Sequence, residues 1–332
     1  MPPVPASMNA LVFTGTGLAM EERPVPLPGP GEARIRVTMA GICNTDVELY
    51  QGYYGFSGVA GHEFTGVVDR APDQPELEGL GVTAEINCGC GACLDCLAGD
   101  PRHCPTRTVI GIVARQGAFA QYLVVPITNL HLLPKGVDDT QAVFTEPLAA
   151  ALEIAEQVHL TPRTKTLVLG DGKLGLLIAC ALRVFCPSLV CVGKHPEKLA
   201  VAQAHGVKTI HVSGPDQYAR HIGEFGRFDV VVEATGSENG PALALDWVKP
   251  RGTLVAKTTS RNPSLIDMAR VVVDEIRIQG SRCGDFSWAL SFLEQGLVEV
   301  TRLVEEIYSF DRFEEAMARA MTPGAKKVLV KF

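Results

Sequence analysis

Residues 165–175 read KTLVLGDGKLG, and this stretch decides the fold. Residues 165–169 form a short, continuously apolar run, which is typical of a strand buried on both faces. The pattern G-x-G-x-x-G follows directly, and an apolar run over residues 174–185 predicts a helix. In such a turn the first glycine permits a sharp bend, the second lets a pyrophosphate approach, and the third lets helix and strand pack closely. The stretch therefore indicates a dinucleotide-binding turn rather than an ordinary glycine-rich loop.

Apolar strands and helices continue to alternate downstream of this turn. We expect strands at residues 165–169, 189–192, 209–212, 228–234, 253–257 and 277–281, and helices at residues 174–185 and 196–205. This alternation predicts a doubly wound parallel sheet covered by helices, so the fold class is α/β. Residues 1–150 read instead as short strands broken by Gly and Pro, which indicates a second, mainly-β domain.

The glycine-rich turn and the end of the next strand supply the candidate cofactor-binding residues. They are Gly170, Gly172, Lys173, Leu174, Gly175, Gly193, Lys194 and His195. In this fold an Asp or Glu at the end of the second strand holds the ribose 2′-hydroxyl of NAD. Gly193 stands there instead, and Lys194 next to it would attract a 2′-phosphate, so the sequence favours NADP over NAD. The alternative is that Lys194 and His195 belong to an ordinary solvated loop.

Five of the ten cysteines lie between residues 88 and 104. In a chain of this length, such clustering favours metal binding over disulfides. The spacing Cys90-x2-Cys93-x2-Cys96-x7-Cys104 suits a closed, tetrahedral, structural zinc site. Cys88 is a competing ligand, and an iron–sulfur cluster is the rival occupant of four thiolates.

A second set of candidate ligands is dispersed along the chain. Cys43 lies in the segment GICNTD, His62 and Glu63 lie in GHEFTG, and Glu146 begins EPLAAALE. Taken singly, these residues have ordinary explanations as a small core residue, a loop histidine and charges near helix or strand ends. Taken together with the four-cysteine segment and the GDGKLG turn, in this order, they resemble the zinc-containing alcohol dehydrogenase branch of the medium-chain dehydrogenase/reductase superfamily.

The resemblance covers nearly the whole chain and implies its domain organisation. A GroES-like catalytic domain of residues 1–150 and 282–332 is expected around a Rossmann dinucleotide-binding domain of residues 151–281. The tail, with an expected helix near residues 313–320 and a last strand at 327–331, would then return to the first domain. A homo-dimer or homo-tetramer is the assembly that the family implies.

The resemblance also implies one catalytic zinc ion beside the structural one. Cys43, His62 and Glu146 are its expected ligands, with Glu63 in or next to the coordination sphere. Glu146 stands where ethanol-type dehydrogenases have a second cysteine and where polyol, threonine and sugar dehydrogenases often have Glu. We therefore expect the chain to resemble that second group, with either Glu63 or Glu146 bound to the zinc.

Three polar residues near Cys43 complete the implied catalytic set. Asp46 is expected to orient the ring of His62, and Thr45 to accept the proton of the alcohol. Glu48 stands where many relatives have a relay histidine, so it either continues the proton path or is a solvated charge.

The implied activity is hydride transfer between NADP(H), or NAD(H), and a small alcohol, polyol or sugar-like carbonyl compound. Two alternatives remain open: a zinc-free quinone or enoyl reductase on the same fold, and a non-enzymatic dinucleotide-binding protein. The net charge of −7 without basic runs argues against nucleic-acid binding. The absence of a long apolar stretch or a signal-peptide pattern predicts no membrane partner and a cytoplasmic location.

Overall fold

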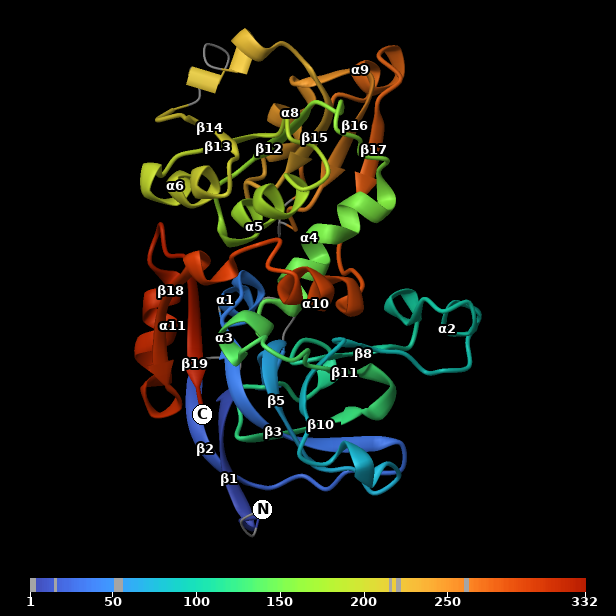
Figure 1. The fold of residues 1–332 in the computed structure, drawn as a ribbon, viewed down its shortest axis with the longest axis vertical. Coiled ribbons are helices and arrows are strands. Elements are labelled where there is room, and N and C mark those ends of the chain that lie inside the picture. Colours follow the sequence, from blue (N-terminus) through green and yellow to red (C-terminus); the bar gives the residue numbers. More distant parts are fainter. Residues whose placement is uncertain (1–3, 15–16, 51–55, 215–216, 219–221, 260–262) are drawn as a thin grey trace. The chain divides into compact units, whose positions relative to one another are not determined.

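The computed structural model describes residues 4–14, 17–50, 56–214, 217–218, 222–259 and 263–332. The chain folds as two compact units, of which unit 1 combines Met1–Glu146 with Val304–Phe332, and unit 2 is Pro147–Leu303 (Figure 1). No helix in the described part of the chain has the length and apolarity needed to cross a bilayer.

Unit 2 is built on a six-stranded parallel sheet with the order β14-β13-β12-β15-β16-β17. Its strands are β12 (Thr166–Leu169), β13 (Val190–Gly193), β14 (Lys208–His211), β15 (Phe228–Glu233), β16 (Val248–Ala256) and β17 (Arg277–Gly280). Counted along the chain this is the order 3-2-1-4-5-6 of a Rossmann sheet. The predicted α/β, doubly wound fold is confirmed.

Helices precede, connect and follow these strands in the chain. They are α4 (Thr145–Gln157, which begins in unit 1), α5 (Lys173–Leu182), α6 (Pro196–Ala204), α8 (Gly240–Leu245), α9 (Met268–Val273) and α10 (Phe286–Glu294), with 3-10 turns η5 (Gly223–Phe225) and η6 (Val300–Leu303). α5 and α6 pack on β12, β13 and β14, whereas α8 packs on β15 and β16 (Figure 1). Leu167, Val192, Val231 and Leu254 lie in the resulting core. The glycine-rich turn thus joins the central strand β12 to the buried helix α5.

Unit 1 contains three antiparallel or mixed sheets. Their strands are β1 (Ser7–Phe13), β2 (Leu18–Pro24), β3 (Glu32–Gly41), β4 (Gly58–Val59), β5 (Glu63–Arg70), β6 (Gly81–Ala84), β7 (Asn87–Cys88), β8 (Thr108–Ile110), β9 (Ala114–Arg115), β10 (Tyr122–Pro126), β11 (Leu130–Leu132), β18 (Val304–Ser309) and β19 (Lys327–Lys331). The largest sheet has the order β11-β6-β5-β3-β19-β18, with β10 also on β3. The tail therefore returns to the N-terminal strands, as expected, because β19 pairs with β3.

Short helices connect these strands. They are α1 (Asn44–Tyr50), α2 (Leu94–Leu97), α3 (Asp139–Ala142) and α11 (Phe313–Met321), with 3-10 turns η2 (Pro75–Leu77), η3 (Pro101–His103), η4 (Ile127–Asn129) and η7 (Phe310–Arg312). α11 packs on β18 and β19 through its buried face, and its Phe313 meets Phe119 edge to face at 4.6 Å. β3 thus lies at the centre of unit 1, between β5 and β19, where the candidate site forms.

Candidate functional site

Cys43, His62 and Glu63 gather where β3 ends and β5 begins. Gly41 of β3 pairs with Glu63 of β5, so the segments GICNTD and GHEFTG lie side by side. One potential ligand atom from each of the three residues lies within 4.8 Å of the others. A thiolate, an imidazole and a carboxylate form a donor set that suits zinc. The structure thus brings together three of the four ligand candidates near the expected catalytic zinc.

Asp46 lies against both Cys43 and His62. Its Oδ2 accepts the backbone N–H of Cys43 at 2.8 Å, and its Oδ1 lies 3.3 Å from Nδ1 of His62 without the geometry of a hydrogen bond. Both Asp46 and His62 are buried. Burial is the largest single influence on the pKa of His62 and lowers it, but Asp46 and Cys43 act together in the opposite direction and raise that pKa well above its ordinary value. The carboxylate is therefore positioned beside the ring, as a partner that orients it would be.

Glu63 has a partner that the sequence did not reveal. Nζ of Lys327, on β19, lies 2.7 Å from Oε1 and 2.5 Å from Oε2 of Glu63. Both side chains are almost fully buried, with exposed fractions of 5% and 1%. Burial is the largest single influence on the pKa of Lys327 and lowers it, but Glu63, together with Cys43 and Glu146, raises that pKa above its ordinary value. Gly41 leaves room for the pair, since a Cβ there would lie 2.5 Å from Oε2 of Glu63.

Glu146 lies in the first turn of α4, outside the close group of Cys43, His62 and Glu63. Part of its surface remains accessible, yet burial raises the pKa of its carboxyl to about 7, with the charge of His62 opposing the shift. Its pKa also responds to Glu63 and Lys327, so Glu146 belongs to the same electrostatic cluster.

Thr45 and Glu48 lie on α1, the helix that follows Cys43. Oγ1 of Thr45 lies 3.8 Å from Sγ of Cys43, at the edge of the candidate metal cluster. Glu48 is half-buried one turn further along the helix. Their roles in a proton path stay predictions.

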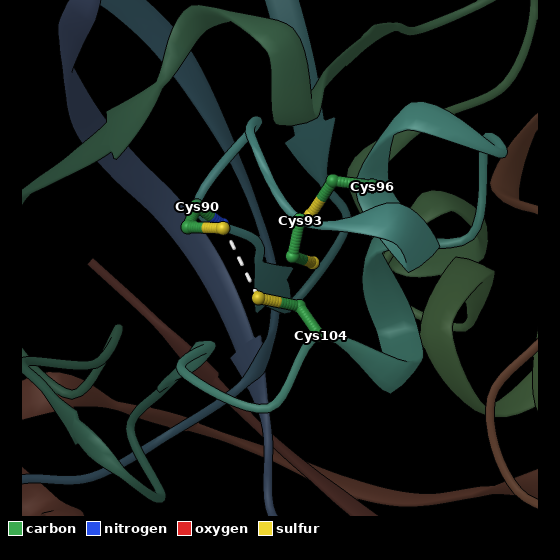
Figure 2. Close-up of side chains that lie close together, drawn as sticks. All are labelled: Cys90, Cys93, Cys96 and Cys104. Carbon is green, nitrogen blue, oxygen red and sulfur yellow. Dashed lines mark hydrogen bonds between the residues drawn. The ribbon is translucent and has the colours of Figure 1, made fainter.

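Cys90, Cys93, Cys96 and Cys104 form a separate cluster around α2 and η3, with the four sulfurs within 4.8 Å of one another (Figure 2). A tetrahedral zinc ion with Zn–S bonds of about 2.3 Å requires a similarly compact arrangement of sulfurs. The backbone N–H of Cys90 donates to Sγ of Cys104 at 3.4 Å, and this contact lowers the pKa of Cys104 to about 6. The residues fit the structural zinc site that their spacing predicts.

Cys88, the competing ligand candidate, lies outside that cluster. It belongs to β7, where its Sγ faces the carbonyl of Ile86 at 3.9 Å and Nδ2 of Asn129 at 3.7 Å. Burial raises its pKa to about 11, which disfavours the thiolate that a metal needs.

The glycines of the turn after β12 differ in their conformation and in the space around them. Gly170 has φ +115°, and a Cβ there would lie 2.4 Å from the carbonyl oxygen of Ala234. A Cβ on Gly175 would lie 2.2 Å from the carbonyl oxygen of Gly170. No atom lies within 4 Å of the position that a Cβ on Gly172 would take, so the backbone there is open to a ligand. Lys173 and Leu174 follow in the first turn of α5.

The end of β13 carries a feature that the sequence analysis missed. Gly193, Lys194 and His195 lie together there, with the Lys194 side chain exposed. The carboxylate of Asp171, from the glycine-rich turn, lies over Gly193 and accepts the backbone N–H groups of Lys194 and His195. The position of an acid within a glycine-rich motif gave no sign of this contact.

Two family models match the chain. The alcohol dehydrogenase GroES-like domain matches residues 29–135, and the zinc-binding dehydrogenase model matches residues 174–295. Sorbitol dehydrogenase of Halalkalibacterium halodurans is 28% identical over 97% of this chain and 99% of its own length. D-xylulose reductase A of Aspergillus oryzae is 26% identical over 99% of this chain and 98% of its own length.

Solved structures agree with these matches. A short chain alcohol dehydrogenase (rspB) from E. coli CFT073, complexed with NADH, has a TM-score of 0.92 at 27% identity and covers 99% of this chain and 100% of its own. A zinc-binding dehydrogenase from Sinorhizobium meliloti 1021, bound to NADP, has a TM-score of 0.89 at 26% identity with the same coverage. With the Rossmann sheet and both cysteine-containing motifs in place, the chain belongs to the zinc-containing alcohol dehydrogenase family of the medium-chain dehydrogenase/reductase superfamily.

Proposed function

We propose that this chain is a zinc-dependent dehydrogenase that transfers a hydride between a nicotinamide dinucleotide and a small polyol or sugar-like carbonyl compound. Its family acts on alcohols, and its relatives include a sorbitol dehydrogenase and a D-xylulose reductase. The observation that carries the proposal is the convergence of Cys43, His62 and Glu63 beside Glu146.

Cys43, His62 and Glu146 are the ligands that we propose for the catalytic zinc. The negative charge of Glu63 is already compensated by Lys327, which also occupies both carboxylate oxygens. Glu146 has no such direct ion pair within the described part of the chain, and burial is the main cause of its raised pKa. We infer that Glu63 stays outside the coordination sphere. A zinc ion held there would act as a Lewis acid on the oxygen of the substrate.

The remaining residues of the site hold ligands and move the proton. Asp46 would orient the ring of His62, which lies beside it, and its contact with the backbone N–H of Cys43 ties that residue to the first turn of α1. Thr45 would accept the proton of the alcohol through Oγ1, and Glu48 would carry it onward to solvent. The nicotinamide, when bound, accepts the hydride in the oxidation and supplies it in the reduction.

We propose that the turn Gly170–Gly175 binds the pyrophosphate and that NADP(H) is preferred to NAD(H). Lys194, exposed at the end of β13, is the residue that would attract the 2′-phosphate. One such charge-assisted contact contributes about 1.5–3 kcal/mol, or roughly a tenfold to 150-fold preference if nothing opposes it. Similar structures bound to NADH and to NADP support dinucleotide binding without deciding between the two.

The four-cysteine cluster would hold the structural zinc. Four thiolates close the coordination sphere of that ion, so no position is left for a substrate. Its contribution is therefore to the stability of the loop between β7 and β8 rather than to the reaction.

We further propose a cytoplasmic homo-dimer or homo-tetramer. Large apolar side chains are exposed on and around α9, among them Leu265 at 84%, Val272 at 71% and Val273 at 80%. The neighbouring strand β17 is the edge of its sheet, and an uncovered edge with apolar surroundings favours association. Light scattering on the purified protein tests the assembly.

Metal analysis combined with two variants tests the proposal. The unaltered chain should hold one catalytic and one structural zinc ion, and His62→Ala or Cys43→Ser should lose the catalytic one together with turnover. Affinity for the dinucleotide should persist, because the glycine-rich turn is remote in sequence from both residues. His159→Ala, which removes an exposed histidine outside both candidate metal clusters, is the matched control. Unchanged turnover in metal-depleted His62→Ala would instead indicate a zinc-free reductase.

A further inference from the structure

Asp171 is a buried carboxylate that the proposed reaction does not use. It is the second residue of the glycine-rich turn and is only 7% exposed. Its Oδ2 accepts the backbone N–H of Lys194 at 2.8 Å and that of His195 at 2.7 Å, and lies 3.0 Å from Nδ1 of the His195 ring. The turn after β12 is thereby tied to the end of β13 by one carboxylate.

The carboxylate occupies the space where a side chain at position 193 would begin. A Cβ built on Gly193 would lie 2.4 Å from Cγ and 2.5 Å from Oδ2 of Asp171. No real Cβ makes such contacts, so Gly193 and Asp171 depend on each other. The residues at the end of β13 include no acid, but the carboxylate of Asp171 lies there in the folded chain.

The end of the second strand is where a dinucleotide-binding sheet contacts the adenosine ribose. An acid at the end of the second strand accepts a hydrogen bond from the ribose 2′-hydroxyl and repels a 2′-phosphate. Asp171 brings the same charge to the same strand end from the neighbouring turn. Asp171 is buried, so its charge is screened less by water and salt than that of Lys194, which is exposed.

We propose that Asp171 is a specificity-determining residue for the dinucleotide, which favours an unphosphorylated ribose and acts against Lys194. The inference rests on the proposed dinucleotide binding. It limits the preference for NADP(H) to less than Lys194 alone would produce, so the unaltered chain should use both dinucleotides.

Two cofactor fragments, ADP-ribose and its 2′-phosphate, test this by calorimetry without any turnover. The quantity measured is the ratio of their dissociation constants on the full-length chain. Asp171→Asn keeps the size and an acceptor oxygen but removes the charge. It should shift the ratio about tenfold or more toward the 2′-phosphate, because the negative charge that repels this phosphate is removed. Lys194→Ala should shift the ratio the other way.

Gly193→Ala provides a second route to the same effect, because its Cβ would displace the carboxylate of Asp171. Glu197→Gln, at an exposed acid in the first turn of α6, is the control and should leave the ratio unchanged. If Asp171 only braces the turn, Asp171→Asn and Gly193→Ala will weaken both fragments equally, and that result would overturn the inference. Failure of the unaltered chain to bind either fragment would overturn the proposed dinucleotide function itself.

Discussion

Glu63 and Lys327 are opposite charges held almost out of water, 264 positions apart in the chain. Removing one partner of a buried ion pair leaves the other charge uncompensated. Lys327→Met should therefore lower the free energy of unfolding by about 3–5 kcal/mol, measured by denaturant titration of the zinc-loaded protein. Lys331→Met, on the same strand but exposed, is the control. Equal stability of the two variants would contradict the importance of the pair.

The contacts of Lys327 and Asp171 could not be predicted from the sequence. Metal binding could be predicted for the residues that lie in recognisable motifs, namely Cys43, His62 and the four clustered cysteines. Lys327 is the first residue of the last strand and belongs to no motif, and the pairing of β19 with β3 brings it to Glu63. Asp171 occupies a position of the glycine motif that has no required residue type. The structure shows that its carboxylate contacts Lys194 and His195, the basic residues on which the predicted preference for NADP rests.

At the scale of single elements, we expect two glycines of the glycine-rich turn to differ in role, one needed for binding and the other for folding. Gly172 has φ −66° and open space around its would-be Cβ, so Gly172→Ala should fold normally. It should nevertheless weaken ADP-ribose binding about tenfold or more, because the new methyl group stands where the pyrophosphate approaches. Gly170→Ala, at φ +115°, should instead lower the melting temperature. Calorimetry and thermal melting of both variants check this, and full ADP-ribose affinity in Gly172→Ala would contradict the assigned turn.

The four-cysteine loop is the second element with a distinct prediction. Cys93→Ser removes one of four sulfurs that converge on one point, so the variant should lose one zinc ion and melt at a lower temperature or assemble differently. Metal analysis, thermal melting and light scattering together decide the outcome. Loss of the metal with unchanged melting and unchanged assembly would rule out a structural role.

Strand and helix periodicity predicted most elements of unit 2, because buried parallel strands are apolar throughout. β12, β13 and β15 appear within a residue or two of the expected ranges. β16 begins at Val248, whereas the expected strand began at residue 253. Residues 249–251 are polar or proline and exposed, so the first part of β16 lacks the apolar pattern that predicts a buried strand. In unit 1 the last helix and the last strand appear where the sequence predicts them, but the order of the strands could not be predicted, because pairings such as β3 with β19 join distant segments.

At the scale of the whole molecule, the chain assigns different tasks to its two units. Unit 1 contains both candidate metal clusters, and unit 2 contains the turn that we propose binds the dinucleotide. The expected domain bounds, residues 1–150 with 282–332 for the catalytic domain and residues 151–281 for the Rossmann domain, stay a prediction.

We propose that zinc-dependent hydride transfer uses the candidate metal site of unit 1 together with the dinucleotide bound to unit 2. Its most direct test is the absorbance of reduced nicotinamide while the zinc-loaded chain is offered a panel of polyols, sugars and secondary alcohols with each dinucleotide. We predict turnover with at least one polyol, its loss when a chelator removes the zinc, and its recovery when zinc is restored. Turnover that persists without zinc, or none on the whole panel despite bound zinc and dinucleotide, would contradict the account.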